Sequence, residues 1–324
     1  MPPSSSAETP PDPPPPLGSS TLSRGLPEVS PQEPGISREI PGAGATLPEG
    51  SALFGRIPAA RGTLREGETV VLLDDRGRRY HLTLRRGRVF QTPRVGLLPH
   101  DRLIGLPEGT RLATPGGATV LVLRPTLEEA LQTIPRRTQI LFPKDIGLIL
   151  LRGNILPGST VLEAGIGSGA LAAALLRYLG PGGHLISYEI RPEFARLAQE
   201  NLAYFQAAFG DSGARHTVRL RDVYQGIEER DLDTVILDVP EPWRAAGHAA
   251  EALRPGGVLL CWVPTALQLY EIARTLQEDP RYGDVAVTET LLRPWDVGPQ
   301  SARPAHRMVA HTGFLISARR TAAP

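Results

Sequence analysis

The sequence predicts an α/β protein built on a mostly parallel, doubly wound sheet. From about residue 146 short apolar runs alternate with helical stretches, and parallel strands need a crossover, usually a helix, between them. A glycine-rich loop follows the first of these runs, at the end of the strand where open α/β sheets bind their ligands. A separate region before residue 125 has the short, turn-bounded runs of a small β domain.

The composition fits two domains and a tail. The chain has 324 residues, 41% of them apolar, with 35 basic and 34 acidic side chains. Its single cysteine leaves neither a disulfide framework nor a thiolate zinc site, and we expect no metal. Because it lacks both an apolar run of about 18 residues and a secretory signal, we expect a cytoplasmic protein with no membrane partner.

Residues 1–50 are expected to form a disordered tail. They hold 13 of the 33 prolines, interspersed with serine and glycine, and their net charge is −4. Apolar residues are too sparse there to offset the entropy lost on ordering. The tail contains no motif that indicates a function.

Residues 51–124 are expected to form the small β domain. The candidate strands are residues 69–73, 80–84, 89–91 and 119–123, separated by turn signals. This region holds 13 arginines and six acids, a net charge of +7, whereas residues 125–324 sum to −2. Arginines in the expected hairpins form a candidate phosphate-contacting face: Arg78, Arg79, Arg85 and Arg86. A solvated strand face is the alternative, and the charge difference between the regions favours nucleic acid.

The region from residue 146 onward supplies the strands of the main sheet. Five strands are expected in βαβα order, at residues 160–164, 184–189, 217–220, 232–237 and 256–263. Two more, near 284–292 and 312–318, follow with a proline-rich loop between them and no helix. We expect these two to form an antiparallel hairpin at the sheet edge.

Three glycines at every second position, Gly165, Gly167 and Gly169, follow the first strand and lead into a helix that begins near Gly169. Dinucleotide sites also place glycines there, but with the spacing G-x-G-x-x-G. Glu163 lies two residues ahead of the first glycine, beside the helix N-terminus where a pyrophosphate would bind. The pattern therefore favours a cationic ligand without phosphate, such as S-adenosylmethionine.

Acids also mark the ends of the next three strands. Glu189 lies where a carboxylate accepts hydrogen bonds from ribose hydroxyls, Asp222 can accept from an adenine amino group, and Asp238 ends the fourth strand. Each acid alone is also explained as a helix N-cap. Acids at four consecutive strand ends are together typical of a methyltransferase.

Five segments carry a more specific resemblance. They are TQILFPKD at residues 138–145, LEAGIGSG at 162–169, SYE at 187–189, LDVPEPW at 237–243 and HTGFL at 311–315. Together they resemble the tRNA (adenine-N1)-methyltransferases that modify adenine 58 in the T-loop, over about residues 55–320. Many methyltransferases share the glycine loop, whereas the first, fourth and fifth segments are more specific to this family.

The resemblance implies a Rossmann-like class I methyltransferase with a mixed seven-stranded sheet, preceded by a small β-barrel-like domain. It implies that residues 51–124 contact tRNA, that 125–145 form a linker and cofactor-lid segment, and that 146–320 form the methyltransferase domain. Its bacterial and archaeal members are homotetramers, so a homotetramer is expected.

The resemblance also implies the site residues. Asp238 would be the catalytic acid, and S-adenosylmethionine would contact Gly165, Gly167, Ser168, Gly169, Ala170, Leu171, Glu189, Phe194, Asp222 and Asp238. For Phe194 a place in the core is an equally good interpretation. Phe142 and His311 are the further substrate-binding candidates, although His311 is better explained by a structural role. The chain departs from the family pattern at Phe142, where tyrosine is frequent, and at Ala310, where glycine is frequent.

Adenine N1 carries its own lone pair, so the expected reaction needs no strong base but requires the base to leave its folded loop. Phe142, Trp243 and Tyr188 are the candidate stacking platforms. Three alternatives remain: a methyltransferase with another RNA or non-RNA substrate, a non-catalytic tRNA-binding subunit, and a nicotinamide enzyme. In a non-catalytic subunit the glycine loop is expected to be degraded, whereas this chain keeps Gly165, Gly167 and Gly169.

Overall fold

A computed structural model of the chain describes residues 62–136 and 140–322. The expected tail, residues 1–50, lies outside the described residues, as do residues 51–61 of the expected β domain and 137–139 of the expected lid segment. Within the described part, no helix is long and apolar enough to cross a membrane.

The first described region is a small antiparallel β structure. Its main sheet has the order β2-β1-β6-β5, from β1 (Thr69–Asp74), β2 (Arg79–Thr83), β5 (Arg111–Ala113) and β6 (Thr119–Leu123). Strands β3 (Val89–Thr92) and β4 (Gly96–Pro99) pair separately and lead into the 3₁₀ turn η1 (His100–Arg102). The four predicted strands are present. The barrel-like closure is not confirmed, because among the described residues β2 and β5 are the sheet's edges.

The large sheet confirms the predicted mixed seven-stranded fold. Its order is β12-β15-β11-β10-β7-β8-β9. The strands are β7 (Thr160–Ala164), β8 (His184–Glu189), β9 (Arg215–Leu220), β10 (Leu232–Leu237), β11 (Leu253–Val263), β12 (Tyr282–Glu289) and β15 (Phe314–Arg320). Strands β7 to β11 run parallel to one another, and β15 runs antiparallel to both β11 and β12. The last strand along the chain therefore lies inside the sheet, between β11 and the edge strand β12.

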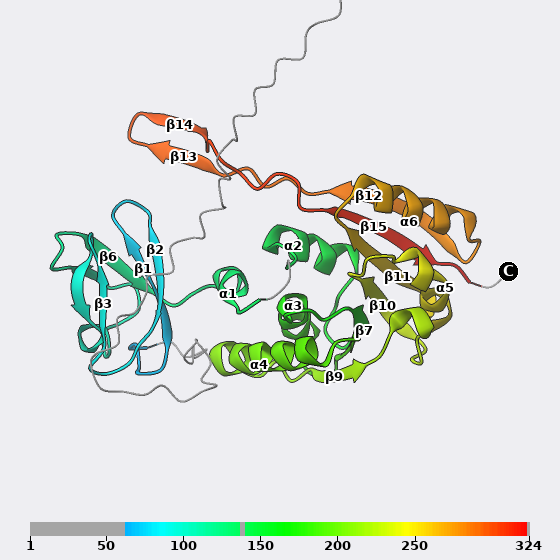
Figure 1. Cartoon of the computed structure of the whole chain (residues 1–324), viewed down its shortest axis with the longest axis horizontal. Helices are drawn as coiled ribbons and strands as arrows, with labels where there is room; N and C mark the ends of the chain where they lie inside the picture. Colours follow the sequence, from blue (N-terminus) through cyan, green and yellow to red (C-terminus); the bar gives the residue numbers. More distant parts are fainter. Residues whose placement is uncertain (1–61, 137–139, 323–324) are drawn as a thin grey trace, which may run out of the picture. The chain divides into compact units, whose positions relative to one another are not determined.

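Helices cover both faces of this sheet (Figure 1). One core contains residues of α1 (Leu127–Thr133), α2 (Pro143–Arg152), α3 (Ala170–Leu179) and α4 (Pro192–Phe209), and the other contains residues of α5 (Trp243–Ala252) and α6 (Ala266–Glu278). Successive side chains of a strand point to opposite faces of the sheet, so neighbouring residues belong to different cores. Val161 and Ile236 belong to the first, whereas the next residues, Leu162 and Leu237, belong to the second.

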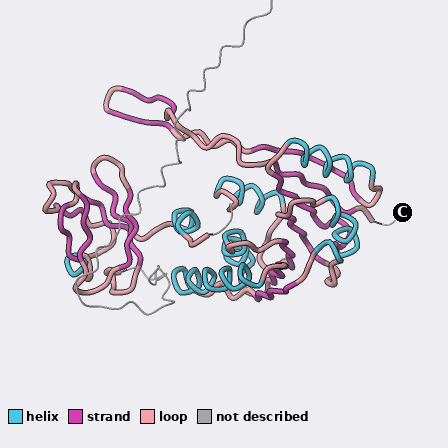
Figure 2. Tube along the Cα trace, in the orientation of Figure 1, coloured by secondary structure: helices cyan, strands magenta, loops and turns pink. Residues whose placement is uncertain are grey.

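A hairpin that the sequence did not predict interrupts the connection from β12 to β15. It consists of β13 (Trp295–Gly298) and β14 (Ser301–Pro304), where a proline-rich loop was expected (Figure 2). Its apolar side chains face solvent: Trp295 is 59% exposed and Val297 is 78% exposed.

Candidate active site

The glycine loop turns from β7 into α3. Gly167 and Gly169 have φ angles of +55° and +82°, which favour glycine, and Gly169 is the N-cap of α3. A Cβ added at Gly169 would lie 3.3 Å from Ala198, so the loop packs closely on α4. Asn201 of α4 fixes the loop from below: its Nδ2 donates to the carbonyl oxygens of Ser168 at 2.8 Å and Pro135 at 3.0 Å. Sequence reasoning missed Asn201, because a single polar residue in an amphipathic helix carries no signal.

Glu189 ends β8 beneath the same loop. Its buried carboxylate accepts hydrogen bonds from the backbone N–H of Gly167 at 3.3 Å, Ile190 at 3.0 Å and Arg191 at 3.1 Å. A Cβ added at Gly165 would come within 3.3 Å of Glu189 Oε2. The glycine and the carboxylate therefore fit against each other.

Asp238 follows β10 directly and is tied to the glycine loop through its backbone. Its carbonyl oxygen accepts a hydrogen bond from the N–H of Gly165 at 3.3 Å. The carboxylate is half-buried, and none of the hydrogen bonds among the described residues engages it. Burial raises the pKa of Asp238 to about 7. A carboxylate that the protein leaves without a partner is suited to bind a group on a ligand.

Glu163, the acid ahead of the glycines, is 1% exposed and accepts a hydrogen bond from the Ser187 hydroxyl at 2.6 Å. Burial raises its pKa to about 8; the Ser187 bond lowers it, and the nearby charge of Asp238 raises it further. The sequence predicted that Glu163 lies beside a cationic ligand, but it did not indicate that Ser187 is its hydrogen-bond partner.

Asp222 and Phe194 each lie at the N-terminal end of a helix. Asp222 is the N-cap of η2 (Val223–Gln225), where its Oδ1 accepts from the N–H of Tyr224 at 2.9 Å. The helix N-cap, which was the alternative interpretation of Asp222, is therefore present in the structure. Phe194 is buried in the first turn of α4, with the guanidinium of Arg191 3.8 Å from its ring centre.

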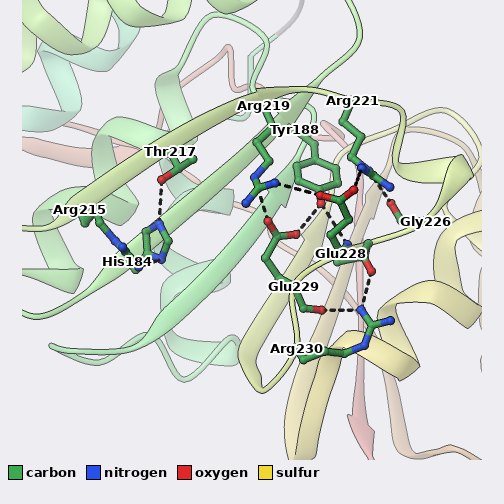
Figure 3. A network of polar contacts seen from close by, with 11 residues as sticks. His184, Tyr188, Arg215, Thr217, Arg219, Arg221, Gly226, Glu228, Glu229 and Arg230 are labelled. Carbon is green, nitrogen blue, oxygen red and sulfur yellow. Dashed lines mark hydrogen bonds and ion pairs between the residues drawn. The ribbon is translucent and has the colours of Figure 1, made fainter.

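Tyr188 is removed from the candidate stacking platforms. Its ring is fully buried and its hydroxyl donates to Glu229 (Figure 3). Arg219 binds Glu229 at 3.0 Å, and Arg221 pairs with Glu228 in the same network. Trp243, the first residue of α5, is half-buried against the core, as Phe142 is at the start of α2, so these two residues stay the candidate platforms.

Two of the specific sequence segments meet at a buried lysine. Phe142 is the half-buried N-cap residue of α2, and Lys144 lies two positions after it. Lys144 Nζ donates to Asp145 Oδ1 at 2.8 Å, to the carbonyl of Thr290 at 2.7 Å and to the hydroxyl of Thr312 at 2.6 Å. The start of α2 is thereby fixed to the segment that leads into β15.

His311 is 46% exposed in its side chain, but both ring nitrogens have partners in the protein. Nδ1 lies 2.7 Å from Glu289 Oε1, and Nε2 lies 2.8 Å from the carbonyl oxygen of Pro264. These two hydrogen bonds raise the pKa of His311. Its geometry is that of a residue that orients a loop.

The four arginines of the expected phosphate-contacting face differ in their surroundings. Arg79 is paired with Glu129, and Arg86 lies 3.2 Å from Glu66 and 3.8 Å from Asp101. For Arg78, which is exposed, and Arg85, which is half-buried, the described residues provide no side-chain ion pair. Two of the four arginines are therefore already paired with acids of the chain.

The strand order brings the candidate residues to one edge. Strands β10, β7, β8 and β9 are neighbours, so Asp238, the glycine loop, Glu189 and Asp222 follow their carboxyl ends side by side. Fold and site together define a Rossmann-like methyltransferase.

Comparison with known proteins gives the family. Residues 118–305 match the family described as tRNA methyltransferase complex GCD14 subunit, and residues 62–111 match the TrmI-like N-terminal family. The chain belongs to this family of tRNA (adenine-N1)-methyltransferases. It is 33% identical to the tRNA (adenine(57)-N(1)/adenine(58)-N(1))-methyltransferase TrmI of Methanocaldococcus jannaschii, over 77% of this chain and 94% of that protein. It is 35% identical to a tRNA (adenine(58)-N(1))-methyltransferase TrmI of Thermus thermophilus, over 78% of this chain and 96% of that protein.

Two solved structures share the fold over most of the chain. The tRNA (m1A58) methyltransferase TrmI of Aquifex aeolicus has a TM-score of 0.71 and 29% identity, covering 81% of this chain and 100% of that one. A Thermotoga maritima structure described as a SAM-dependent O-methyltransferase has a TM-score of 0.75 and 33% identity, covering 81% of this chain and 96% of that one.

Proposed function

We propose that this chain transfers a methyl group from S-adenosylmethionine to N1 of adenine 58 in the T-loop of tRNA. The observation that carries the proposal is Asp238, a half-buried carboxylate without a partner in the described chain, tied to Gly165 of the glycine loop. Two curated relatives about one-third identical over most of the chain are named for this reaction, which supports the assignment.

The residues at the strand ends fit S-adenosylmethionine. The hydroxyl of Ser168 is buried without a hydrogen-bond partner among the described residues, and the adjacent glycines leave room for close approach to the backbone. We assign the cofactor contacts to Gly165, Gly167, Ser168, Gly169, Ala170, Leu171, Glu189, Phe194, Asp222 and Asp238. When bound, S-adenosylmethionine supplies an electrophilic methyl group on a sulfonium centre.

Asp238 is the catalytic acid of the proposal. Adenine N1 is already a nucleophile, and positive charge spreads to the exocyclic N6 as the new bond forms. A carboxylate that accepts a hydrogen bond from N6 stabilises this charge more in the transition state than in the ground state. The prolines at positions 240 and 242 restrict the backbone that follows Asp238, which favours a fixed carboxylate.

The remaining parts of the chain bind the RNA in this proposal. Residues 51–124 contact the tRNA backbone through Arg78, Arg79, Arg85 and Arg86, and residues 125–145 form the linker and cofactor lid next to the methyltransferase domain, residues 146–320. Phe142 stacks on the extruded adenine, and His311 supports the substrate side of the pocket. The match of residues 62–111 to the TrmI-like N-terminal family supports this division.

We also propose a cytoplasmic homotetramer. The exposed Trp295 and Val297 of the β13–β14 hairpin are apolar side chains suited to an interface between copies of the chain. Light scattering on the purified protein should give four times the chain mass of 34.9 kDa. A monomeric mass at micromolar concentration would contradict the tetramer without affecting the activity.

The decisive experiment is nucleoside mass spectrometry on an unmodified tRNA transcript incubated with the enzyme and S-adenosylmethionine. We expect N1-methyladenosine at position 58 and none in a matched transcript with guanosine there. Methylation of an oxygen atom instead of N1 would match the description of the Thermotoga structure as an O-methyltransferase. Binding of the transcript without any methyl transfer would indicate a non-catalytic subunit.

A further inference from the structure

Three polar side chains form a continuous line across one face of the large sheet. Glu163 comes from β7, Ser187 from β8 and His216 from β9. The Ser187 oxygen lies 2.6 Å from Glu163 Oε1 and 2.9 Å from His216 Nε2. Strand β10 lies on the other side of β7, and Asp238 directly follows it. Because side chains alternate along the strands, Asp238 belongs to the same face of the sheet as Glu163. The line therefore begins next to the proposed catalytic carboxylate.

The direction of the hydrogen bonds follows from the number of protons. Because Ser187 donates its single hydroxyl proton to Glu163 Oε1, a proton on Glu163 lies on Oε2, and the Ser187 oxygen accepts from the Nε2–H tautomer of His216. Burial lowers the pKa of His216 to about 4, so the imidazole is neutral and this is its only proton. His216 also lines a cavity of about 260 Å³ with residues of α3 and α4, such as Leu176 and Phe205.

The charges around Glu163 favour its neutral form. Asp238 from β10 is a like charge, and Glu189 on the same face of β8 already accepts three backbone N–H groups. Helix α3, which packs on β8, presents the alanines and leucines of residues Ala170–Leu175. Lys144 at the start of α2 is engaged by its own partners. Glu163 Oε2 is buried with no partner among the described residues, and leaving an ionised oxygen unpartnered there costs more free energy than leaving a neutral hydroxyl.

We propose that Glu163 is a positioning residue that carries a proton in the working enzyme and is held by Ser187 and His216. Of the two neighbouring carboxyl groups, Glu163 on β7 and Asp238 after β10, only Asp238 is then charged. This inference rests on the proposed function for the role of Asp238. With Glu163 neutral, the negative charge is concentrated where the methylated ring becomes positive, and the fixed side chain supports the start of the glycine loop. Burial, which raises the pKa of Glu163 to about 8, agrees with this arrangement.

The protonation of Glu163 can be measured without any RNA. The infrared difference spectrum between the wild-type protein and Glu163→Gln at pH 7 should contain the C=O stretch of a protonated carboxyl group. A spectrum with only carboxylate bands would overturn the proposal, whatever the outcome of the methylation assay. A pH series of the Asp238→Asn difference spectrum is the control: because burial raises the pKa of Asp238 only to about 7, its protonated C=O band should disappear at lower pH than the Glu163 band.

Kinetics test the coupling to Asp238. In Glu163→Gln the midpoint of the acid side of the kcat/KM pH profile should stay in place, because a neutral group has been replaced by a neutral group. If Glu163 were ionised, its removal would take a like charge from Asp238 and move the midpoint down by about one pH unit. A shift of that size would refute the proposal, whereas a wild-type enzyme that methylates no tRNA would refute the proposed function instead.

The line of hydrogen bonds is tested by paired substitutions. Ser187→Ala and His216→Leu should lower kcat about tenfold with little change in the KM for S-adenosylmethionine, because each removes a bond that fixes Glu163. His216→Gln retains a donor and should recover most of that loss. Thr217→Val, on the opposite face of β9, is the matched control and should change kcat less than twofold. Equal losses in Ser187→Ala and Thr217→Val, or no recovery in His216→Gln, would contradict the positioning role.

Discussion

Lys144 Nζ and the hydroxyl oxygen of Thr312 lie 2.6 Å apart, although 168 positions separate them in the chain. The Thr312 hydroxyl accepts from Lys144 and donates to Asp145 Oδ2 at 2.7 Å, while Asp145 Oδ1 accepts from Lys144 at 2.8 Å. The side chains of the ion pair are each 6% exposed. This closed triangle explains why the segments 138–145 and 311–315 belong together: each supplies polar groups that the other buries.

Removing Lys144 should strongly destabilise the fold. Lys144→Met leaves the buried Asp145 carboxylate without its cation, and breaking a buried pair in this way costs about 3–5 kcal/mol of the free energy of unfolding. Urea denaturation measures the loss. Arg274→Met is the control, because Arg274 forms exposed pairs with Glu271 and Glu278 that contribute at most about 1 kcal/mol. Similar losses for both variants would show that the triangle contributes no more than a surface pair.

Two glycines should respond to alanine in opposite directions. A Cβ at Gly313 would lie 2.3 Å from the Trp262 ring, so Gly313→Ala must move the ring or the backbone and should lower stability by about 1–3 kcal/mol. Gly147 is exposed within α2 with nothing within 4 Å of an added Cβ, so Gly147→Ala should raise stability by about 0.5–1 kcal/mol. Thermal unfolding of the two variants compares them directly. A stabilised Gly313→Ala would mean that the Trp262 contact is loose.

The main sheet could be predicted from the sequence because its central strands are apolar runs bounded by turn residues. The predicted and observed limits agree for β7, β8 and β10. The β13–β14 hairpin was missed because Pro294 and Pro299 flank β13 and each of its strands has only four residues, too few for an alternation to be recognised. The three-residue β5 was missed because it is too short to show a period.

The acids of the site could be predicted because each lies at a strand end, which local sequence reveals. Their partners could not. Ser187 and His216 reach Glu163 only through strand neighbours in the folded sheet, and Asn201 reaches the glycine loop from a different helix. The acids that neutralise Arg79 and Arg86 are likewise 50 and 20 positions away in sequence. Charge counted along the chain therefore does not show which arginines are paired.

Replacing Asp238, the proposed catalytic acid, should slow methyl transfer and leave the fold intact. Asp238→Asn keeps the shape of the side chain but removes the charge that stabilises the methylated ring, and we expect kcat to fall by about 10²–10³. Asp238→Ala should be at least as slow. Single-turnover methylation of the tRNA transcript gives the rate, and calorimetry gives the affinity for S-adenosylmethionine, which should change little. Near-normal turnover by either variant would exclude Asp238 from the mechanism.

The pH dependence should report the same carboxyl group. Because burial raises the pKa of Asp238 from 3.8 to about 7, the group is protonated and ineffective below that pH, so kcat/KM should rise with pH through about 7. The native state then binds more protons than the unfolded state between about pH 4 and 7, so this group's contribution to stability decreases as pH rises across that window. In Asp238→Asn the rise of kcat/KM should be absent and the loss of stability across this window should be smaller, with the contribution of Glu163 remaining. A profile that stays flat in the wild type would contradict the assignment.

Charge reversal should separate arginines that are available to RNA from those that are already paired. Arg78 is exposed with no ion pair among the described residues, whereas Arg86 lies between Glu66 and Asp101. We expect Arg78→Glu to weaken tRNA binding several-fold and to reduce the slope of log Kd against log salt by about one, with a smaller effect for Arg86→Glu. Filter binding across a salt series measures both, and the affinity for S-adenosylmethionine should stay constant. If both substitutions left tRNA binding unchanged, the β domain would not be the phosphate-contacting face.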